Sequence, residues 1–181
     1  MLGRTDLPLD AVGRAQAAQL AGAIGPLDAV WSSPLLRAQQ TAAALLPDCA
    51  PGPVRLEPDL TEMDQGELDG CGEAELRARF GDLLVRWRHD PGGLRLPGGE
   101  TMDEVQVRAL GALARVAAAT PPGARIGVVT HQLVLSSALC ALRGEPLTAW
   151  RTHNHLNTAW TEVRWSTPVQ VVAERIGPHL G

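Results

Sequence analysis

The 181-residue sequence contains no lysine, so all sixteen of its basic residues are arginines. This bias can reflect genome composition, although arginine also suits bidentate phosphate contacts better than lysine does. Acidic residues outnumber basic ones and give a formal net charge of −4. Because this charge generates no overall positive field, the sequence predicts no binding to nucleic acid or to an anionic membrane.

Cysteine and long apolar runs are also scarce. Cys49, Cys71 and Cys140 form an odd set without the spacing of a metal site, which favours a reducing compartment. The opening MLGRTDLPLD lacks the apolar core of a signal peptide, and no later stretch has the length and apolar character of a membrane span. We therefore expect a cytoplasmic protein.

The remaining composition is that of a globular domain, with 45% hydrophobic and 20% charged residues. Residues 1–181 fit a single domain with one continuous core, and no repeat, low-complexity tract or interdomain linker divides them. Strand-like and helical segments alternate through most of the chain. This alternation predicts a three-layer α/β/α domain with a mostly parallel central sheet.

The expected elements follow from periodicity and from helix-boundary residues. Ser33 and Pro34 predict the N-cap and first position of one helix, and Thr101 with Glu104 predicts a capping box. Helices are expected over 11–24, 34–46, 73–88 and 101–119 and after His131, and strands over 27–31, 54–56, 126–129, 158–165 and 169–176.

The segment RIGVVTHQLVLSSALC, residues 125–140, predicts a buried strand that ends at His131 and an apolar helix behind it. In an α/β sheet, a polar residue at the carboxyl end of a strand faces the crevice where ligands bind. The helix start directs its free N–H groups to the same crevice and favours an anion there. His131 is thus a candidate anion ligand, and the alternative is a histidine whose ring the core satisfies.

Two further residues are candidates for the same chemistry. Arg37 lies in the first turn of its predicted helix, where a cation opposes the helix dipole unless it contacts an anion beyond the helix start; the alternative is a solvated surface arginine. Glu62 lies in the acidic loop 59–66, which either places a carboxylate in a cleft or is an ordinary solvated turn. His153 and His155 lack the neighbours of a zinc site, so we predict no metal.

Several separated motifs occur in the order and spacing of one known family. They are GRTDLPLDAVGRAQAAQLA, SSPLLRAQQTA, LTEMDQGELDG, PGGETMDEV, VVTHQLVLSSALC and LNTAWTEV. Each motif alone is unspecific, but together they resemble the histidine phosphatase superfamily, in its phosphoglycerate mutase-like branch, from Gly3 to about Trp165.

The resemblance implies phosphoryl transfer through a phosphohistidine, on a small phosphorylated metabolite. We predict that the protein has no cofactor. It implies that Arg37 clamps the phosphate, that His131 hydrogen-bonds the transferring oxygens and that Glu62 gives a proton to the leaving oxygen. Gly3 and Gln132 match positions that line the pocket. The chemistry agrees, because a protonated His131 and an arginine stabilise the charge of the transition state, and a carboxylic acid near a phosphate dianion has a raised pKa.

The signature Arg-His-Gly of this family, whose histidine is the nucleophile, is absent from the sequence. By resemblance, it ends a strand internal to the sheet, so the first strand is missing and its two neighbours have unpaired edges. We expect that the true start lies upstream of Met1 and that the 181 residues alone are inactive. No other histidine, including His89, matches the position of the nucleophile.

Departures from the family separate the remaining hypotheses. Met63, Asp64 and Gln65 replace the aromatic or basic residues that follow the glutamate in true mutases, which favours a phosphatase over a mutase. The alternatives are a pseudophosphatase that only binds inorganic phosphate or a phospholigand, and a metal-dependent hydrolase that uses His153 and His155. A helical insert over 73–99 is expected to cover the pocket. The sequence identifies neither the substrate nor the oligomeric state.

Overall fold

The computed structural model describes residues 2–177. Its α-helices are α1 (Ala11–Ile24), α2 (Leu36–Cys49), α3 (Glu73–His89), α4 (Met102–Ala118) and α5 (Gln132–Arg143). Its strands are β1 (Ala29–Ser32), β2 (Arg55–Leu56), β3 (Ile126–Val129), β4 (Trp160–Arg164) and β5 (Gln170–Ile176). Short 3₁₀ helices are η1 (Pro58–Leu60), η2 (Gly66–Leu68) and η3 (Leu147–His153).

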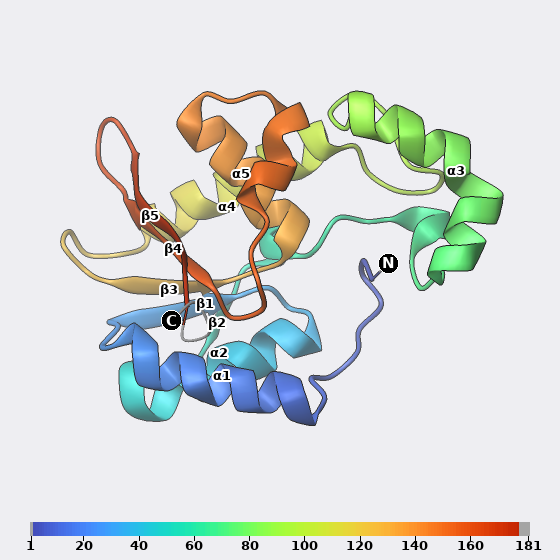
Figure 1. The fold of residues 1–181 in the computed structure, drawn as a ribbon. Coiled ribbons are helices and arrows are strands. Elements are labelled where there is room, and N and C mark those ends of the chain that lie inside the picture. The colour runs from blue at the N-terminus through green and yellow to red at the C-terminus, as the bar shows by residue number, and fades with distance from the viewer. Residues whose placement is uncertain (1, 178–181) are drawn as a thin grey trace.

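The central sheet is parallel, with strand order β2-β1-β3. β1 pairs with β3 from Ala29↔Ile126 to Ser32↔Val129, so both strands end at the same edge. Helices α1 and α2 lie on one side of the sheet, and α4 and α5 lie on the other (Figure 1). This arrangement confirms the predicted α/β class with a parallel central sheet. It places the residue after β3 at the carboxyl edge, where ligands of such sheets bind.

Strands β4 and β5 form a separate antiparallel pair and are not hydrogen-bonded to the central sheet. Within the described residues, β3 therefore pairs with β1 on one side and with no strand on the other. An unpaired interior edge presents free backbone N–H and C=O groups. The resemblance predicts unpaired edges in the central sheet, and the absence of a strand there stays a prediction.

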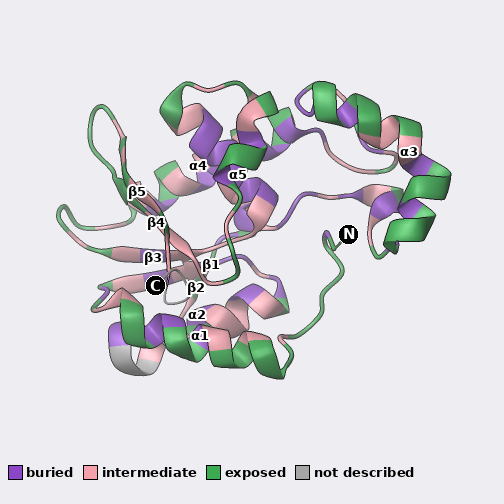
Figure 2. Cartoon of the chain, viewed as in Figure 1, coloured by how far each residue is buried: buried purple, intermediate pink, exposed green. Residues whose placement is uncertain are grey.

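Two apolar clusters hold the layers together (Figure 2). One lies between α1, β1 and α2 and includes Leu20, Val30 and Leu45. The other joins α3, α4 and α5 through residues such as Phe80 and Val105. The buried positions of α4 recur at helical spacing, which is why periodicity alone located this helix.

The start of α2 differs from the prediction by two residues. The helix begins at Leu36, because the Ser33 hydroxyl accepts a hydrogen bond from Leu35 N–H (3.2 Å) in a turn before the helix. The N–H of Leu36 donates instead to Asp6 Oδ1, at 2.6 Å. A carboxylate thirty positions away thus replaces the local cap that the sequence suggested.

The predicted capping box at Thr101 is confirmed, because Thr101 and Glu104 exchange both hydrogen bonds at the start of α4. No helix formed within residues 2–177 is both long enough and apolar enough to cross a bilayer.

Candidate active site

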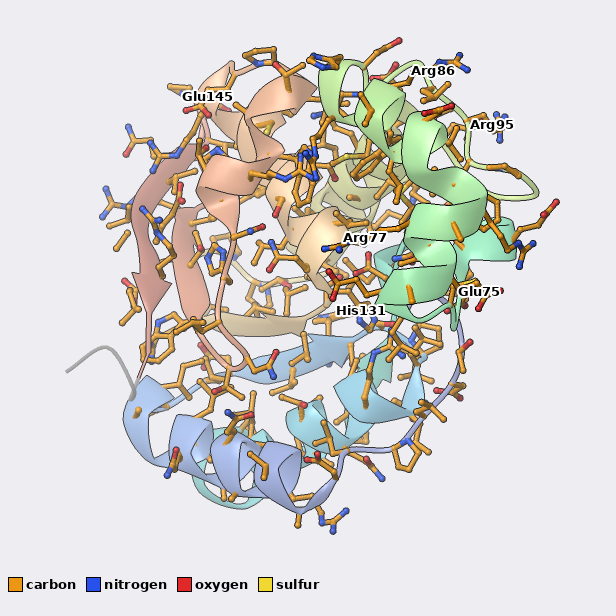
Figure 3. The ribbon with its side chains drawn as sticks, turned by 45° about the vertical axis from the view of Figure 1, so that its right-hand side comes forward. Glu75, Arg77, Arg86, Arg95, His131 and Glu145 are labelled. Carbon is orange, nitrogen blue, oxygen red and sulfur yellow. The ribbon has the colours of Figure 1, made fainter. Side chains whose placement is uncertain are left out.

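His131 lies at the junction between β3 and α5, where it is the N-cap residue of α5. Figure 3 shows the labelled side chain close to the carboxyl end of the central sheet. Its Nε2 lies 2.8 Å from the hydroxyl oxygen of Ser33, which follows β1 and is fully buried. A hydrogen bond between the ends of the two paired strands therefore fixes the orientation of the ring.

The imidazole of His131 is neutral in this structure. Burial is the main cause, and together with the positive charges of Arg37 and Arg108 it lowers the pKa of the ring to about 3. This differs from the protonated ring expected from the sequence. The reason is tertiary, since two guanidinium groups and the surrounding core disfavour another positive charge. A neutral ring can still donate one N–H to an anion.

Glu62 lies beside His131, in the loop that follows η1, and only 5% of its surface is exposed. Its carboxyl accepts hydrogen bonds from the backbone N–H of Met63 (2.8 Å) and of Leu133 in the first turn of α5 (3.4 Å). Burial raises its pKa, against the opposing effects of these N–H groups and of Arg37 and Arg108. A buried carboxyl with a raised pKa is suited to donate a proton.

Arg37 lies in the first turn of α2, and its side chain extends over the helix start, as the sequence suggested. Its Nη1 donates to Thr5 O (2.9 Å) and its Nη2 donates to Gly3 O (2.8 Å). Two of five N–H donors are thus used by these contacts. The charge is close enough to lower the pKa of both Glu62 and His131, so the three side chains form one cluster.

Gly3 contacts the cluster through Arg37, whereas the Gln132 side chain makes its hydrogen bonds elsewhere. Gly3 is buried, and its N–H donates to Asp69 Oδ1 (2.8 Å) while its carbonyl accepts from Arg37. The Gln132 side chain points toward the loop before β4, where it donates to Asn154 Oδ1 (3.1 Å) and accepts from His155 N–H (3.1 Å). Gln132 therefore ties that loop to the start of α5.

A groove of about 930 Å³ begins at the cluster, with Arg37, Glu62 and His131 among its lining residues. The rest of the groove runs between the unpaired edge of β3 and strand β4, over α1 and α2. Trp160 of β4 lines it, and the unpaired edge of β3 runs along it.

The expected insert over 73–99 consists of α3 and the loop after it. Leu76, Phe80 and Trp87 of α3 are buried in the cluster shared with α4 and α5. No described residue of the segment lines the groove. Its role in covering the pocket stays a prediction.

His153 and His155 have protein partners at all four ring nitrogens. His153 contacts Glu174 (3.1 Å) and Glu145 (2.9 Å), and His155 contacts His153 O (2.7 Å) and Thr161 Oγ1 (2.7 Å). The described residues contain no group of three or more His, Cys, Asp or Glu side chains arranged to hold a metal ion. The geometry gives the metal-dependent hypothesis no support.

Sequence reasoning missed Ser33 as the partner of His131 and missed Arg108 altogether. Ser33 is visible in the sequence only as a helix-start residue, because its contact depends on the pairing of β1 with β3. Arg108 lies between the buried Val105 and Ala109 of α4 and, although it is an arginine, its side chain is only 14% exposed. An arginine on the edge of an apolar helix face was the available signal.

Comparison with known proteins adds independent findings. A family model described as the histidine phosphatase superfamily (branch 1) matches residues 1–175. The 2,3-bisphosphoglycerate-dependent phosphoglycerate mutase 2 of Gloeobacter violaceus is 38% identical over 113 residues, which cover 60% of this chain and 51% of that protein. The chain thus spans about half the length of that relative. A probable phosphoglycerate mutase, GpmB of Cronobacter sakazakii, is 35% identical over 161 residues, 82% of this chain and 69% of its own.

The fold also resembles solved structures. A mycobacterial glucosyl-3-phosphoglycerate phosphatase in complex with inorganic phosphate superposes with a TM-score of 0.82 at 26% identity. The match covers 98% of this chain and 91% of that one. Both mutase-like and phosphatase relatives are therefore similar to this chain.

Proposed function

Because the chain belongs to the histidine phosphatase superfamily, branch 1, we propose that it is a phosphomonoester hydrolase that transfers the phosphoryl group through a phosphohistidine. The observation that carries the proposal is the convergence of Arg37, Glu62 and His131 at one end of the groove. A cation, a neutral hydrogen-bond donor and a buried carboxylic acid are the groups that phosphoryl transfer requires.

Each group has a defined part in the reaction. A nucleophilic histidine attacks phosphorus and forms an N–P bond, while the P–O bond to the leaving group breaks. Arg37 and His131 donate hydrogen bonds to the phosphoryl oxygens, and Glu62 gives its proton to the leaving oxygen, so an alcohol departs. In the second step water attacks phosphorus and gives a proton back to Glu62, the N–P bond breaks and inorganic phosphate leaves. Losing one such donor costs roughly 10²- to 10³-fold in rate.

The nucleophile belongs, in this proposal, to a strand upstream of Met1 that fills the groove between β3 and β4. The groove supports this, because the unpaired edge of β3 offers backbone hydrogen bonds to an added strand. The 181 residues alone then bind phosphate without turnover.

The second candidate is a pseudophosphatase that binds phosphate or a phospholigand as its function. It is favoured by the presence of Arg37 and His131 in a chain without the nucleophile. A mutase is less well supported, because residues 63–65 carry no basic or aromatic side chain. We also propose that the protein acts in the cytoplasm.

The in-frame nucleotide sequence upstream of the Met1 codon distinguishes the two candidates. An Arg-His-Gly codon run there is expected, and the protein that includes it should hydrolyse p-nitrophenyl phosphate. That activity should fall roughly 10²- to 10³-fold in His131→Ala. An in-frame stop codon close to Met1 would refute the proposal of an upstream strand. Robust turnover by the 181 residues alone, abolished in His131→Ala, would refute our account of the nucleophile.

Binding of inorganic phosphate by the 181-residue chain tests the anion site itself. Isothermal calorimetry should detect binding that is lost in Arg37→Met and kept in the control Arg125→Met, which removes an arginine from the far part of the groove. Equal loss in both variants would mean that the site is not at Arg37.

A further inference from the structure

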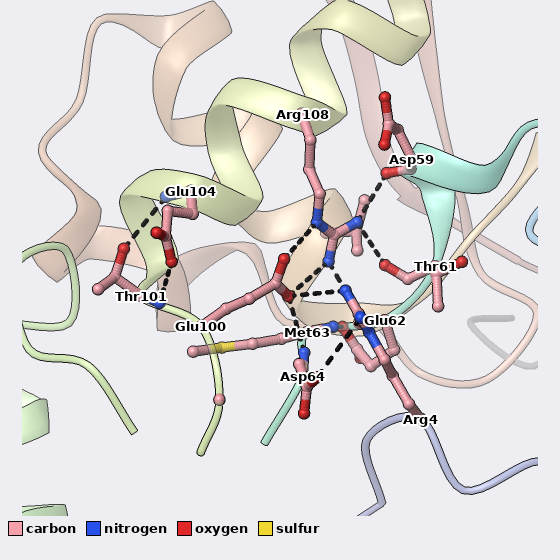
Figure 4. Close-up of polar contacts among 12 residues, drawn as sticks. Arg4, Asp59, Thr61, Glu62, Met63, Asp64, Glu100, Thr101, Glu104 and Arg108 are labelled. Atoms are coloured by element: carbon pink, nitrogen blue, oxygen red, sulfur yellow. Dashed lines mark hydrogen bonds and ion pairs between the residues drawn. The ribbon is translucent and has the colours of Figure 1, made fainter. Parts of the chain in front are cut away.

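Arg108 of α4 holds the loop that carries Glu62 (Figure 4). Its Nε and Nη2 form a bidentate pair with the two carboxylate oxygens of Glu100, at 2.9 and 3.0 Å. Its Nη1 donates to the carbonyls of Asp59 (2.7 Å) and Thr61 (2.5 Å), and its Nη2 also donates to that of Glu62 (3.2 Å). One guanidinium thus fixes three carbonyls of the segment 59–62.

Glu100 extends the same network to the other end of the loop. Its Oε2 accepts a hydrogen bond from Asp64 N–H at 2.8 Å and pairs with Arg4 Nη2 at 3.2 Å. Arg4 Nε donates to the Glu62 carbonyl at 3.2 Å. The backbone is therefore held before, at and after Glu62 by one partly buried ion pair, between Arg108 of α4 and Glu100 of the preceding loop.

The carboxyl of Glu62 depends on this backbone path. Its described hydrogen bonds are to backbone N–H groups, one from Met63 in the same loop and one from Leu133 of α5. Because the contact with Leu133 is already 3.4 Å long, a small shift of the loop would break it and admit water. We propose that Arg108, with Glu100, is a positioning residue that holds Glu62 beside His131; this rests on the proposed role of Glu62 as the acid.

A purely electrostatic role for Arg108 predicts a different result. Among the described residues, Arg37 and Arg108 are the charged groups that act on the Glu62 carboxyl, and His131 lines the same groove. If Arg108 only adds positive charge, removing it raises the pKa of Glu62 further, because a nearby cation favours the carboxylate. If Arg108 holds the loop, removing it lets water reach the carboxyl, and the pKa falls toward the ordinary glutamate value.

The experiment measures the pKa of Glu62 by ¹³C NMR of glutamate-labelled protein, with the signal assigned by its loss in Glu62→Gln. In Arg108→Met and in Arg108→Lys we expect the pKa to fall toward its ordinary value. The lysine variant keeps the charge but lacks the planar fork that binds Glu100 and the carbonyls together. Arg115→Met is the matched control, because Arg115 lies on the same helix and pairs with the side chains of Glu57 and Asp59.

The proposal would be overturned if the pKa of Glu62 rose or stayed unchanged in Arg108→Met, or if it stayed unchanged in Arg108→Lys. An equal fall in the control Arg115→Met would also overturn it. If Arg108→Met does not fold, Glu100→Gln provides the second variant, since it weakens the ion pair but leaves the contacts of Arg108 with the loop carbonyls. In Glu100→Gln we expect a partial fall in the pKa of Glu62. An unchanged pKa in that variant would refute the proposal. The measurement needs no turnover. The pKa measurement can therefore be interpreted even if the phosphatase assay fails. The phosphatase assay can likewise be interpreted if the pKa measurement contradicts the role of Arg108.

Discussion

Replacement of Glu62 by glutamine should stabilise the folded protein at neutral pH. Burial raises the pKa of Glu62, so the fold disfavours the carboxylate that the unfolded chain carries above its ordinary pKa. Wild-type stability is therefore fully present below that ordinary value and is lost as the pH rises through the raised pKa. Glutamine resembles the protonated acid and has no such loss.

The size of the effect follows from linkage. Each unit of upward pKa shift removes about 1.4 kcal/mol of unfolding free energy once the carboxyl is ionised. For Glu62→Gln we therefore expect a gain in unfolding free energy that grows as the pH rises. Each kcal/mol gained raises Tm by about 2–4 °C in a protein of this size. The buried carboxyl thus lowers the stability of the fold at neutral pH while it keeps a raised pKa suited to proton donation, a trade-off that is common at active sites.

Urea unfolding at several pH values between 3 and 8 measures this, with unchanged m-values as the check on the unfolded state. Glu57→Gln is the control of opposite sign, because the hydrogen bonds from Arg115 lower the pKa of Glu57. The contribution of Glu57 to the unfolding free energy is therefore present at neutral pH and is lost as the pH falls through that lowered pKa. If the advantage of Glu62→Gln does not grow as the pH rises, the carboxyl is not destabilised by burial and the reasoning fails.

Two further predictions concern backbone and core. Gly66→Ala should destabilise by about 3 kcal/mol or more in urea unfolding, because Gly66 has φ +52° and an added Cβ would lie 2.0 Å from Pro97 O; Gly81→Ala in α3 meets nothing within 4 Å and should instead stabilise by about 0.5–1 kcal/mol. Leu139→Ala should lower the unfolding free energy by about 2–5 kcal/mol, since Leu139 is 1% exposed in the core; a cost below about 1 kcal/mol would mean that this part of α5 is loosely packed.

The elements of the fold could be predicted because their signals are local. The apolar face of α4, the capping box at Thr101 and the strand before His131 each depend on residues within a few positions. The start of α2 could not be placed, because its cap is Asp6, far away in the sequence. Local patterns identify an element, and tertiary contacts decide where it ends.

The candidate site divides in the same way. The sequence by itself determined which residues belong to it, since Arg37, Glu62 and His131 each stand at a position that the family resemblance marks. The tertiary structure alone decided their chemical states, because burial and neighbouring guanidinium groups make His131 neutral and raise the pKa of Glu62. It alone identified Arg108, whose contacts join residues 49 positions apart. Burial and long-range hydrogen bonds arise only when the chain folds, so no local pattern contains them.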